Sequence, residues 1–190
     1  SVLDNKKLAK MDLKNEKETN LALEKIRNSS FNITKISTKR VKRNPLPPFT
    51  TSTLQQEASN KLSFGASRTM RIAQKLYEGI NIGSETTGLI TYMRTDGVQL
   101  STQAIDELRS EIVNLHGKEY IPQTPRIYKS KAANAQEAHE AIRPTAISRH
   151  PESMSSYLDD EQLKLYELIW KRTISSQMQS AELDETSADI

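Results

Sequence analysis

The sequence predicts a mainly helical fold with a small β component. Much of the chain consists of segments with apolar side chains at helical spacing, several of them opened by a Ser, Thr or Asp that can cap a helix. Runs at 31–41 and 181–190 have the composition of short strands. Three prolines between residues 45 and 48 cannot continue a helix or a central strand. They therefore predict a domain boundary.

The composition favours a helical domain with a large surface. Of the 190 residues, 35% are hydrophobic and 27% are charged, and there is no cysteine. The low apolar fraction predicts poorly packed ends. The lack of cysteine excludes disulfides and thiolate metal sites, as fits a reducing cytosol. No apolar run approaches the ~20 residues of a membrane span, and no signal-peptide pattern opens the chain. We therefore expect a cytoplasmic protein with no membrane partner.

The net charge of +3 is small, but the basic residues are unevenly distributed. Five of them lie in a stretch that contains no acid: Lys35, Lys39, Arg40, Lys42 and Arg43. Such a stripe suits the phosphate backbone of a nucleic acid. A solvated linker or an edge strand kept soluble by charge has the same composition, and it is the commoner explanation of this feature taken alone.

The N-terminal part of the chain predicts one helix and one strand. Residues 1–18 are polar and Lys-rich without a clear period, and they begin without an initiator methionine, so we expect a segment of a longer protein. Thr19 or Asn20 is placed to cap a short helix that ends at Arg27. Its Leu23 and Ile26 are expected to face inward. A strand then follows over residues 31–41, with a bulge or twist at Ile36.

Two helices and a strand follow the prolines. Thr51 or Ser52 is placed to cap a helix that ends near Leu62, and Ser67 a second helix that ends at Gly79. The second helix is expected to bury Met70, Ala73, Leu76 and Tyr77, and to expose Arg68, Arg71 and Lys75. Two short helices joined by a glycine-containing turn and followed by a strand resemble a helix-turn-helix with a wing. An ordinary helical hairpin in a bundle gives the same pattern, so both interpretations stay open.

Three further helices are expected in the second half of the chain. The first begins at Ser101 and ends at Gly117, with a core stripe at helical spacing. A polar connection over 118–133 leads to a short helix over 134–143. The last helix is capped by Asp159 or Asp160, ends near Met178 and is anchored by Trp170.

The segment around Tyr92 carries the strongest candidate for chemistry. Residues 89–93 are predicted to form a short strand, and side chains two apart on a strand share a face, so Tyr92 and Arg94 should point the same way. A phenol is a weak nucleophile at neutral pH, and a nearby guanidinium favours its ionised form. The guanidinium can also hold a phosphate with two hydrogen bonds. The pair therefore suits nucleophilic attack on a phosphodiester; a half-buried strand with a solvated arginine is the alternative.

A second candidate lies in the predicted helix over 134–143. His139 and Arg143 are four residues apart and would share one face of that helix. A metal site is not expected, because Arg143 stands where a zinc-protease motif has its second histidine. The two side chains instead suit an anion clamp. A surface histidine with ordinary hydrogen bonds is the alternative.

Four blocks of the sequence together resemble one family, the bacterial type IA DNA topoisomerases. They occur in that family's order over about residues 45–180, and four ordered blocks are much more specific than one short motif. The blocks are Pro47-Pro-Phe-Thr-Thr-Ser-Thr-Leu-Gln-Gln-Glu-Ala-Ser59, Thr69-Met-Arg-Ile-Ala-Gln-Lys-Leu-Tyr-Glu78, Tyr92-Met-Arg-Thr-Asp96 and Glu137-Ala-His-Glu-Ala-Ile-Arg-Pro144.

The resemblance implies a covalent, ATP-independent mechanism. Tyr92 would attack one DNA strand, become linked to the 5′ phosphate and leave a free 3′ hydroxyl, which reseals the break after strand passage. Relaxation of negative supercoils would follow. Arg94 would bind the scissile phosphate and stabilise charge in the transition state. His139 would contact a nearby phosphate, and Arg143 would face the same DNA-binding surface.

The resemblance also implies a division into domains. Residues 45–180 would form the active-site tyrosine domain, with a winged-helix, catabolite-activator-like fold. Residues 1–44 and 181–190 would belong to the hinge or arch domain, so the chain should enter and leave the tyrosine domain at neighbouring points near Pro45 and Ser180. Mg²⁺ would be bound by a separate N-terminal domain, because these residues contain no Asp-x-Asp. The partners would be single-stranded DNA, the N-terminal magnesium domain and the hinge domain of the same enzyme. That enzyme would be cytoplasmic and associated with the bacterial nucleoid.

Two other classes of protein remain as alternatives. A winged-helix DNA-binding module without catalysis would use its tyrosine structurally and would prefer duplex DNA. A tyrosine recombinase also uses tyrosine, arginine and histidine on DNA, but it makes a 3′ phosphotyrosine. Its tyrosine usually follows the arginine and histidine cluster, whereas Tyr92 precedes His139.

Overall fold

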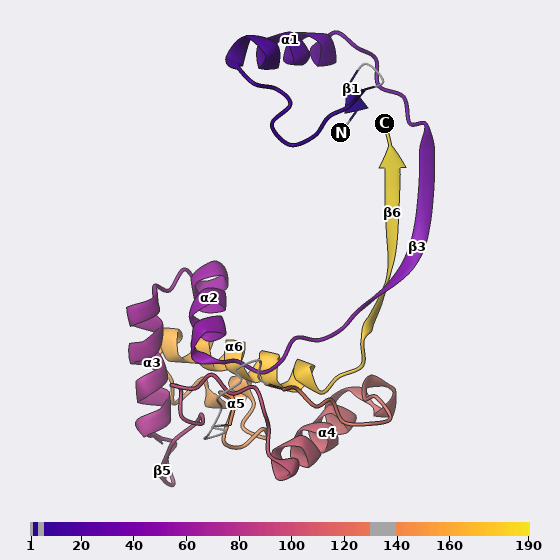
Figure 1. Ribbon diagram of the computed structural model, residues 1–190. Coiled ribbons are helices and arrows are strands. Elements are labelled where there is room, and N and C mark those ends of the chain that lie inside the picture. The colour runs from indigo at the N-terminus through magenta and orange to yellow at the C-terminus, as the bar shows by residue number, and fades with distance from the viewer. Residues whose placement is uncertain (1, 4–5, 130–139) are drawn as a thin grey trace. The chain divides into compact units, whose positions relative to one another are not determined.

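The structure is a computed structural model that describes residues 2–3, 6–129 and 140–190 (Figure 1). Its elements in chain order are β1 (Val2–Leu3), β2 (Lys6–Lys7), α1 (Glu16–Arg27), β3 (Lys35–Arg43), α2 (Thr51–Leu62), α3 (Ala66–Glu78), β4 (Ile80–Asn81), β5 (Thr86–Thr87), α4 (Thr102–His116), the 3₁₀ turn η1 (Lys118–Tyr120), α5 (Pro151–Met154), α6 (Asp160–Ser176) and β6 (Ala181–Asp189). The fold is mainly helical with small two-stranded sheets, so the predicted fold class is confirmed.

The chain forms two compact units. The first consists of residues 1–41 and 183–190, and the second of residues 42–182. The sequence predicts domain boundaries at 44/45 and 180/181, and the assignment of these segments to a tyrosine domain and a hinge stays a prediction. Each unit is described by itself below.

The first unit contains α1 and a long pair of strands. In this unit β3 and β6 lie side by side (Figure 1). The backbone N–H of Thr34 donates to the carbonyl of Asp189 (2.8 Å), and the hydroxyls of Thr38 and Thr186 are 3.0 Å apart. Residue numbers thus rise along β3 as they fall along β6, which makes the pair antiparallel. Because nearly every described side chain on both strands is exposed, the pair is held mainly by its backbone ladder and by contacts between polar side chains.

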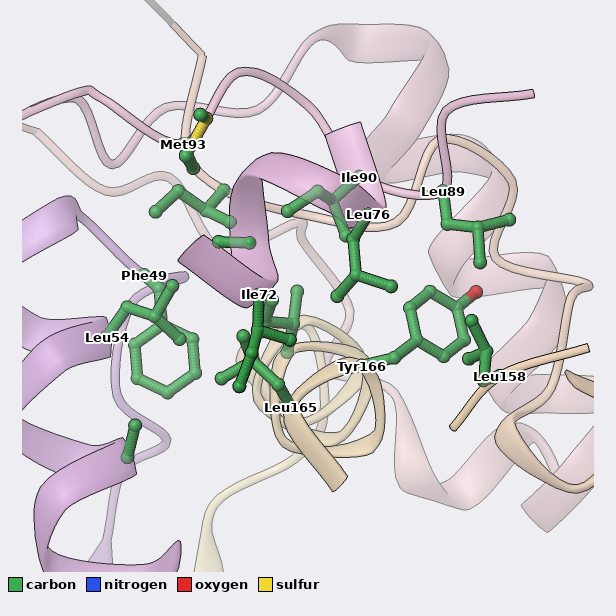
Figure 2. Close-up of a cluster of buried hydrophobic side chains, with 14 of the residues drawn as sticks. Phe49, Leu54, Ile72, Leu76, Leu89, Ile90, Met93, Leu158, Leu165 and Tyr166 are labelled. Carbon is green, nitrogen blue, oxygen red and sulfur yellow. The ribbon is translucent and has the colours of Figure 1, made fainter. Parts of the chain in front are cut away.

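The second unit is built around α2, α3 and α6, which pack against one another. The buried side chains that they contribute gather with those of the segment that follows β5, as Figure 2 shows. The labelled members of this cluster are Phe49, Leu54, Ile72, Leu76, Leu89, Ile90, Met93, Leu158, Leu165 and Tyr166. The segment that bears Tyr92 is therefore anchored directly in the core through its neighbours on either side.

A smaller cluster joins α4 to the C-terminal part of α6. It consists of Leu108, Ile112, Ile147 and Ile174. Ser101 caps α4 by accepting a hydrogen bond from the N–H of Ala104, and Gly117 ends the helix, both as the sequence predicted. Trp170 donates its indole N–H to the carbonyl of Ile147 (2.9 Å), which is the anchoring role expected of it.

The two points where the chain enters and leaves the second unit are tied together. The hydroxyl of Ser180 donates to the side-chain oxygen of Asn44 at 2.7 Å. The Tyr128 hydroxyl lies 3.2 Å from the carbonyl of Pro45 and 3.0 Å from that of Ser176. Burial raises the pKa of Tyr128, so the hydroxyl keeps the proton that these bonds need. The expected proximity of the two ends is confirmed.

Several expected helix starts were wrong by a few residues. The N-caps are Asn15 for α1, Thr50 for α2 and Gly65 for α3. In α2, Thr50 and Thr53 form a reciprocal capping box, which satisfies the free N–H groups better than a cap at Thr51 would. The sequence offered several adjacent Ser and Thr residues, and spacing alone did not separate them.

Some expected core residues are instead exposed. Leu23 and Ile26 of α1 are 43% and 42% exposed, and Ala22 is the buried residue of that helix. On α3, Tyr77 is 40% exposed and Ile72 is buried, so the helix is rotated relative to the expected stripe. The outward positions of Arg68, Arg71 and Lys75 are confirmed.

Among the described residues, extended pairing is found where two predicted elements were expected. The part of the predicted 134–143 helix that the structure describes, residues 140–143, is extended, and Ile142 bridges to Phe49. The predicted strand over 89–93 is reduced to a single bridge between Ile90 and Pro144. The pairing of Ile142 with Phe49 holds residues 140–143 extended. Pro144 lacks an N–H and disfavours helix in the residue before it, so it ends any helix there and limits the ladder with Ile90 to one bridge.

Candidate active site

Tyr92 and Arg94 lie on a segment whose residues alternate between exposed and buried. Tyr92, Arg94 and Asp96 are exposed, whereas Met93, Thr95 and Gly97 are buried. The exposed fraction of Tyr92 is 43% and that of Met93 is 1%. Although the segment is not a regular strand, it keeps the alternation from which the shared orientation of Tyr92 and Arg94 was inferred.

A glycine sets how closely this segment approaches α3. The N–H of Leu89 donates to the carbonyl of Leu76 at 2.7 Å, which brings the chain against the last turn of α3. A Cβ on Gly88 would lie 2.5 Å from the carbonyl oxygen of Tyr77, closer than any side chain tolerates. Gly88 is therefore required for the approach that places Tyr92 beside α3.

The ring of Tyr92 packs against the ring of Tyr77. Their centroids are 5.4 Å apart and the planes are inclined by 64°, an edge-to-face contact. Both rings are partly exposed, so the contact limits the directions open to the Tyr92 phenol without covering it. Sequence reasoning missed this role, because Tyr77 was expected in the core.

Arg94 is available to a ligand. Its side chain is exposed, and among the described residues it makes no hydrogen bond or ion pair. The backbone on both sides of it is fixed by Thr51, the first residue of α2. The Thr51 hydroxyl donates to the carbonyl of Met93 (2.7 Å) and accepts from the N–H of Thr95 (2.9 Å). An exposed guanidinium is thus carried on a well-anchored backbone.

The other side of the Tyr92 segment is held by residues 140–145. The N–H of Thr91 donates to the carbonyl of Arg143 (2.9 Å), and the Thr91 hydroxyl donates to that of Ala141 (2.7 Å). The Thr145 hydroxyl donates to the carbonyl of Gly88 (2.7 Å). Threonine hydroxyls thus hold the segment on both sides, and sequence reasoning had assigned them no role.

Arg143 is engaged within the fold. Its Nε and Nη2 donate to the two carboxylate oxygens of Glu140 at 2.7 and 3.0 Å, and its Nη1 donates to the carbonyl of Pro144 at 2.8 Å. Only 16% of its side chain is exposed. The expected helix that would place it beside His139 is absent at residues 140–143, and His139 lies outside the described residues.

Glu140 is the centre of this second cluster. Its carboxylate also accepts the backbone N–H of Ser101, the N-cap of α4, at 3.0 Å. Burial opposes ionisation of this carboxyl, but the hydrogen bonds from Arg143 and Ser101 outweigh burial and hold its pKa below the ordinary value. The ion pair therefore joins the 140–145 segment to α4, a structural link that the sequence did not reveal.

Three of the five basic residues of the stripe on β3, namely Lys39, Arg40 and Lys42, pair with acids on β6. Within the first unit Lys39 lies 3.4 Å from Glu185, and within the second Lys42 lies 3.1 Å from Glu182. These pairs favour the interpretation of an exposed strand kept soluble by charge over that of a phosphate-binding stripe.

Neither a metal site nor a membrane span is found in the part of the chain that the structure describes. No group of three or more His, Asp or Glu residues comes together there as metal ligands would, so these residues do not fit a magnesium site. No described helix is long and apolar enough to cross a bilayer.

An exposed tyrosine beside an exposed arginine, on a mainly helical domain, defines a candidate phosphoryl-transfer site. Comparisons with known proteins identify the family. The family model described as DNA topoisomerase matches residues 1–190. The DNA topoisomerase 1 of Rickettsia bellii is 54% identical over 188 residues, which is 99% of this chain and 24% of that protein. The DNA topoisomerase 1 of Xylella fastidiosa (strain Temecula1) is 48% identical over 192 residues.

A solved structure shows the same relationship. The full-length topoisomerase I of Thermotoga maritima matches with a TM-score of 0.71 and 41% sequence identity, over 88% of this chain and 26% of that one. The chain therefore belongs to the DNA topoisomerase family, and within it to the bacterial type IA enzymes. It spans about a quarter of the length of the curated relatives that it matches.

Proposed function

We propose that this chain is the tyrosine-bearing part of an ATP-independent type IA DNA topoisomerase. The observation that supports the proposal most strongly is the pair of Tyr92 and Arg94, exposed on a segment whose intervening residue is buried and whose backbone is tied to α2. An exposed phenol can reach a phosphodiester, and an exposed guanidinium can hold the phosphate that it attacks.

The proposed reaction is a reversible transesterification. The Tyr92 hydroxyl gives up its proton, its oxygen bonds to the phosphorus, and the bond from phosphorus to the 3′ oxygen breaks. That oxygen takes up a proton and leaves as a free 3′ hydroxyl, while the 5′ phosphate stays on the tyrosine. Attack of the 3′ hydroxyl on the phosphotyrosine reverses each change and reseals the strand, so no energy source is consumed.

Arg94 is proposed to bind the scissile phosphate and to stabilise the charge that builds on its oxygens. His139 is proposed to contact a neighbouring phosphate, on the family resemblance alone. For Arg143 the geometry supports a different role, because its guanidinium is bound to Glu140 and to the backbone. We propose that it supports the Tyr92 segment through the 140–145 segment and does not contact DNA.

The remaining functions are assigned to other parts of the enzyme. We propose that Mg²⁺ is held by a separate N-terminal domain, and that residues 1–44 and 181–190 belong to the hinge that lets the gate open. Single-stranded DNA is the proposed substrate, relaxation of negative supercoils the proposed outcome, and the bacterial nucleoid the proposed location. The chain alone should bind single strands weakly and cleave them poorly or not at all.

The test uses a single-stranded oligonucleotide labelled at one end or the other. It is incubated with magnesium and this chain, with and without the separately prepared magnesium domain, and protein-linked DNA is measured after denaturation. We expect label linked through the 5′ phosphate, only when the second domain is present, and none with Tyr92→Phe. Efficient cleavage by the chain alone would contradict the divided site, and a 3′ linkage would indicate recombinase chemistry.

A DNA-binding module without catalysis is the second candidate, and one observation favours it. The helices α2 and α3 are joined by a short turn and followed by the β4–β5 hairpin, in which Ile80 pairs with Thr87. This is the order of a helix-turn-helix with a wing. If the chain is such a module, it should bind duplex DNA with a steep salt dependence and form no covalent adduct in any mixture. Tyr92→Phe should then bind DNA as well as the unchanged chain does.

A further inference from the structure

We propose that Thr51 is a positioning residue for Arg94, acting through its side-chain hydroxyl; this rests on the function proposed above. Thr51 contacts the residues on both sides of Arg94. Its hydroxyl donates to the Met93 carbonyl at 2.7 Å and accepts from the Thr95 N–H at 2.9 Å. Its own N–H donates to the Thr95 carbonyl, also at 2.9 Å. One residue thus holds both ends of the three-residue arc that carries Arg94.

The support behind Thr51 is rigid. Thr50 and Thr53 form the capping box that fixes the first turn of α2, with bonds of 2.9 and 3.3 Å between each side chain and the other's N–H. About one and two turns further on, Leu54 and Ala58 are completely buried in the core. The packing of α2 therefore sets the position of the Thr51 hydroxyl. The two hydrogen bonds of this hydroxyl in turn fix the backbone on either side of Arg94.

An apolar group of the same shape cannot make the two hydrogen bonds that the Thr51 hydroxyl makes. Met93 and Thr95 are 1% and 7% exposed, so the carbonyl of one and the N–H of the other have little access to water. Without the hydroxyl both groups lose a partner, and the arc must shift to find another. A shift of about 1 Å in a group that contacts the reacting phosphate is enough to cost a large factor in rate.

The chain offers variants that separate this role from simple stability. Thr51→Val removes the hydroxyl and keeps the shape, whereas Thr51→Ser keeps the hydroxyl and loses a methyl group. Thr173 supplies a matched control, because its buried hydroxyl donates to the Ile169 carbonyl at 2.8 Å, within α6 itself. Thr173→Val therefore loses one hydroxyl bond of the same kind without touching the Tyr92 segment.

The experiment measures the single-turnover rate of covalent adduct formation in the full-length enzyme that contains this chain. We expect Thr51→Val to slow adduct formation by about 10- to 100-fold, and Thr51→Ser and Thr173→Val to stay within about 3-fold of the unchanged enzyme. Loss of the melting transition would mean that Thr51→Val does not fold. In that case Thr51→Ala, which also lacks the hydroxyl, is used instead.

A double-mutant cycle with Arg94 gives the decisive result. If Thr51 acts through Arg94, Thr51→Val should slow the Arg94→Ala enzyme by less than about 3-fold, because the group that it positions is already gone. An unchanged rate in Thr51→Val, or the same slowing with and without Arg94, would overturn the proposal. Tyr92→Phe is measured in parallel: if it still forms the adduct, the proposed function fails as well, whereas loss of the adduct confines any failure to Thr51.

Discussion

Two arginine-bearing segments lie next to each other in the second unit, and they use the same side chain in opposite ways. Thr91 joins them, since its N–H donates to the carbonyl of Arg143. On one segment Arg94 is exposed and, among the described residues, makes no hydrogen bond or ion pair. On the other, Arg143 donates to both oxygens of Glu140 and to the Pro144 carbonyl.

The difference shows that charge and position in a motif do not by themselves define a phosphate-binding residue. A guanidinium that already has a carboxylate partner must lose it before it can bind a phosphate, and partial burial makes that exchange more costly. Arg94 has no such competitor in the described chain. We therefore expect Arg94 to bind a ligand, and we expect Arg143 to hold the 140–145 segment against Thr91 and α4.

Of the two arginine substitutions, Arg94→Ala should have the larger effect on activity. Removing one charged donor from a phosphoryl-transfer site costs about 100-fold in rate, because the charge that develops in the transition state loses its partner. The folded state should be unaffected, since the side chain is exposed. The measurement pairs single-turnover adduct formation with urea unfolding of the same protein. A variant that lost stability but kept its rate would reverse the roles assigned to the two arginines.

Arg143→Ala should give the opposite profile. We expect the free energy of unfolding to fall by about 2 kcal/mol, because the half-buried Glu140 carboxylate would lose its bidentate partner. Once the protein is folded, the adduct should form at a rate within about 10-fold of the unchanged one, a loss well short of that expected for Arg94→Ala. Urea unfolding and the adduct assay at low temperature measure the two quantities separately. Unchanged stability with a lost adduct would mean that Arg143 contacts DNA after all.

The smallest expected effect is a pH dependence of stability that comes from Glu140. Its pKa in the folded chain lies below the ordinary 4.5. Its stabilising contribution is therefore complete above pH 4.5 and is lost as the pH falls through the lower, folded-state pKa. Melting temperatures from pH 7 to pH 3 should fall further for the unchanged chain than for Glu140→Gln, in which this group no longer titrates. Parallel curves would show that the Glu140 carboxylate does not stabilise the fold.

The sequence was informative wherever a local pattern determines the structure. The α4 helix is bounded by Ser101 and Gly117 as predicted, because a cap and a C-terminal glycine act within one turn. The prediction that Tyr92 and Arg94 point the same way followed from simple alternation, which survives even though the predicted strand around them is only one bridge. That both side chains are exposed could not be predicted from the alternation.

The sequence was uninformative wherever long-range pairing competes with local preference. Residues 140–143 have a helical pattern, yet Ile142 pairs with Phe49, far away in the chain, and the segment is extended. The same pairing brings Glu140 to Ser101 and Thr91 to Arg143. None of these partners can be identified from spacing, so the division of labour between the two arginines could not be predicted.

The most direct measurement of the central claim is the identity of the tyrosine that carries the DNA. After cleavage of an oligonucleotide and nuclease trimming, the protein is digested and the nucleotide-bearing peptide is sequenced by mass spectrometry. Tyr77 is the critical competitor, since its ring packs 5.4 Å from that of Tyr92 and is also exposed. Our account predicts the nucleotide on Tyr92, through its 5′ phosphate. A nucleotide on Tyr77, or on any other tyrosine of the chain, would contradict it.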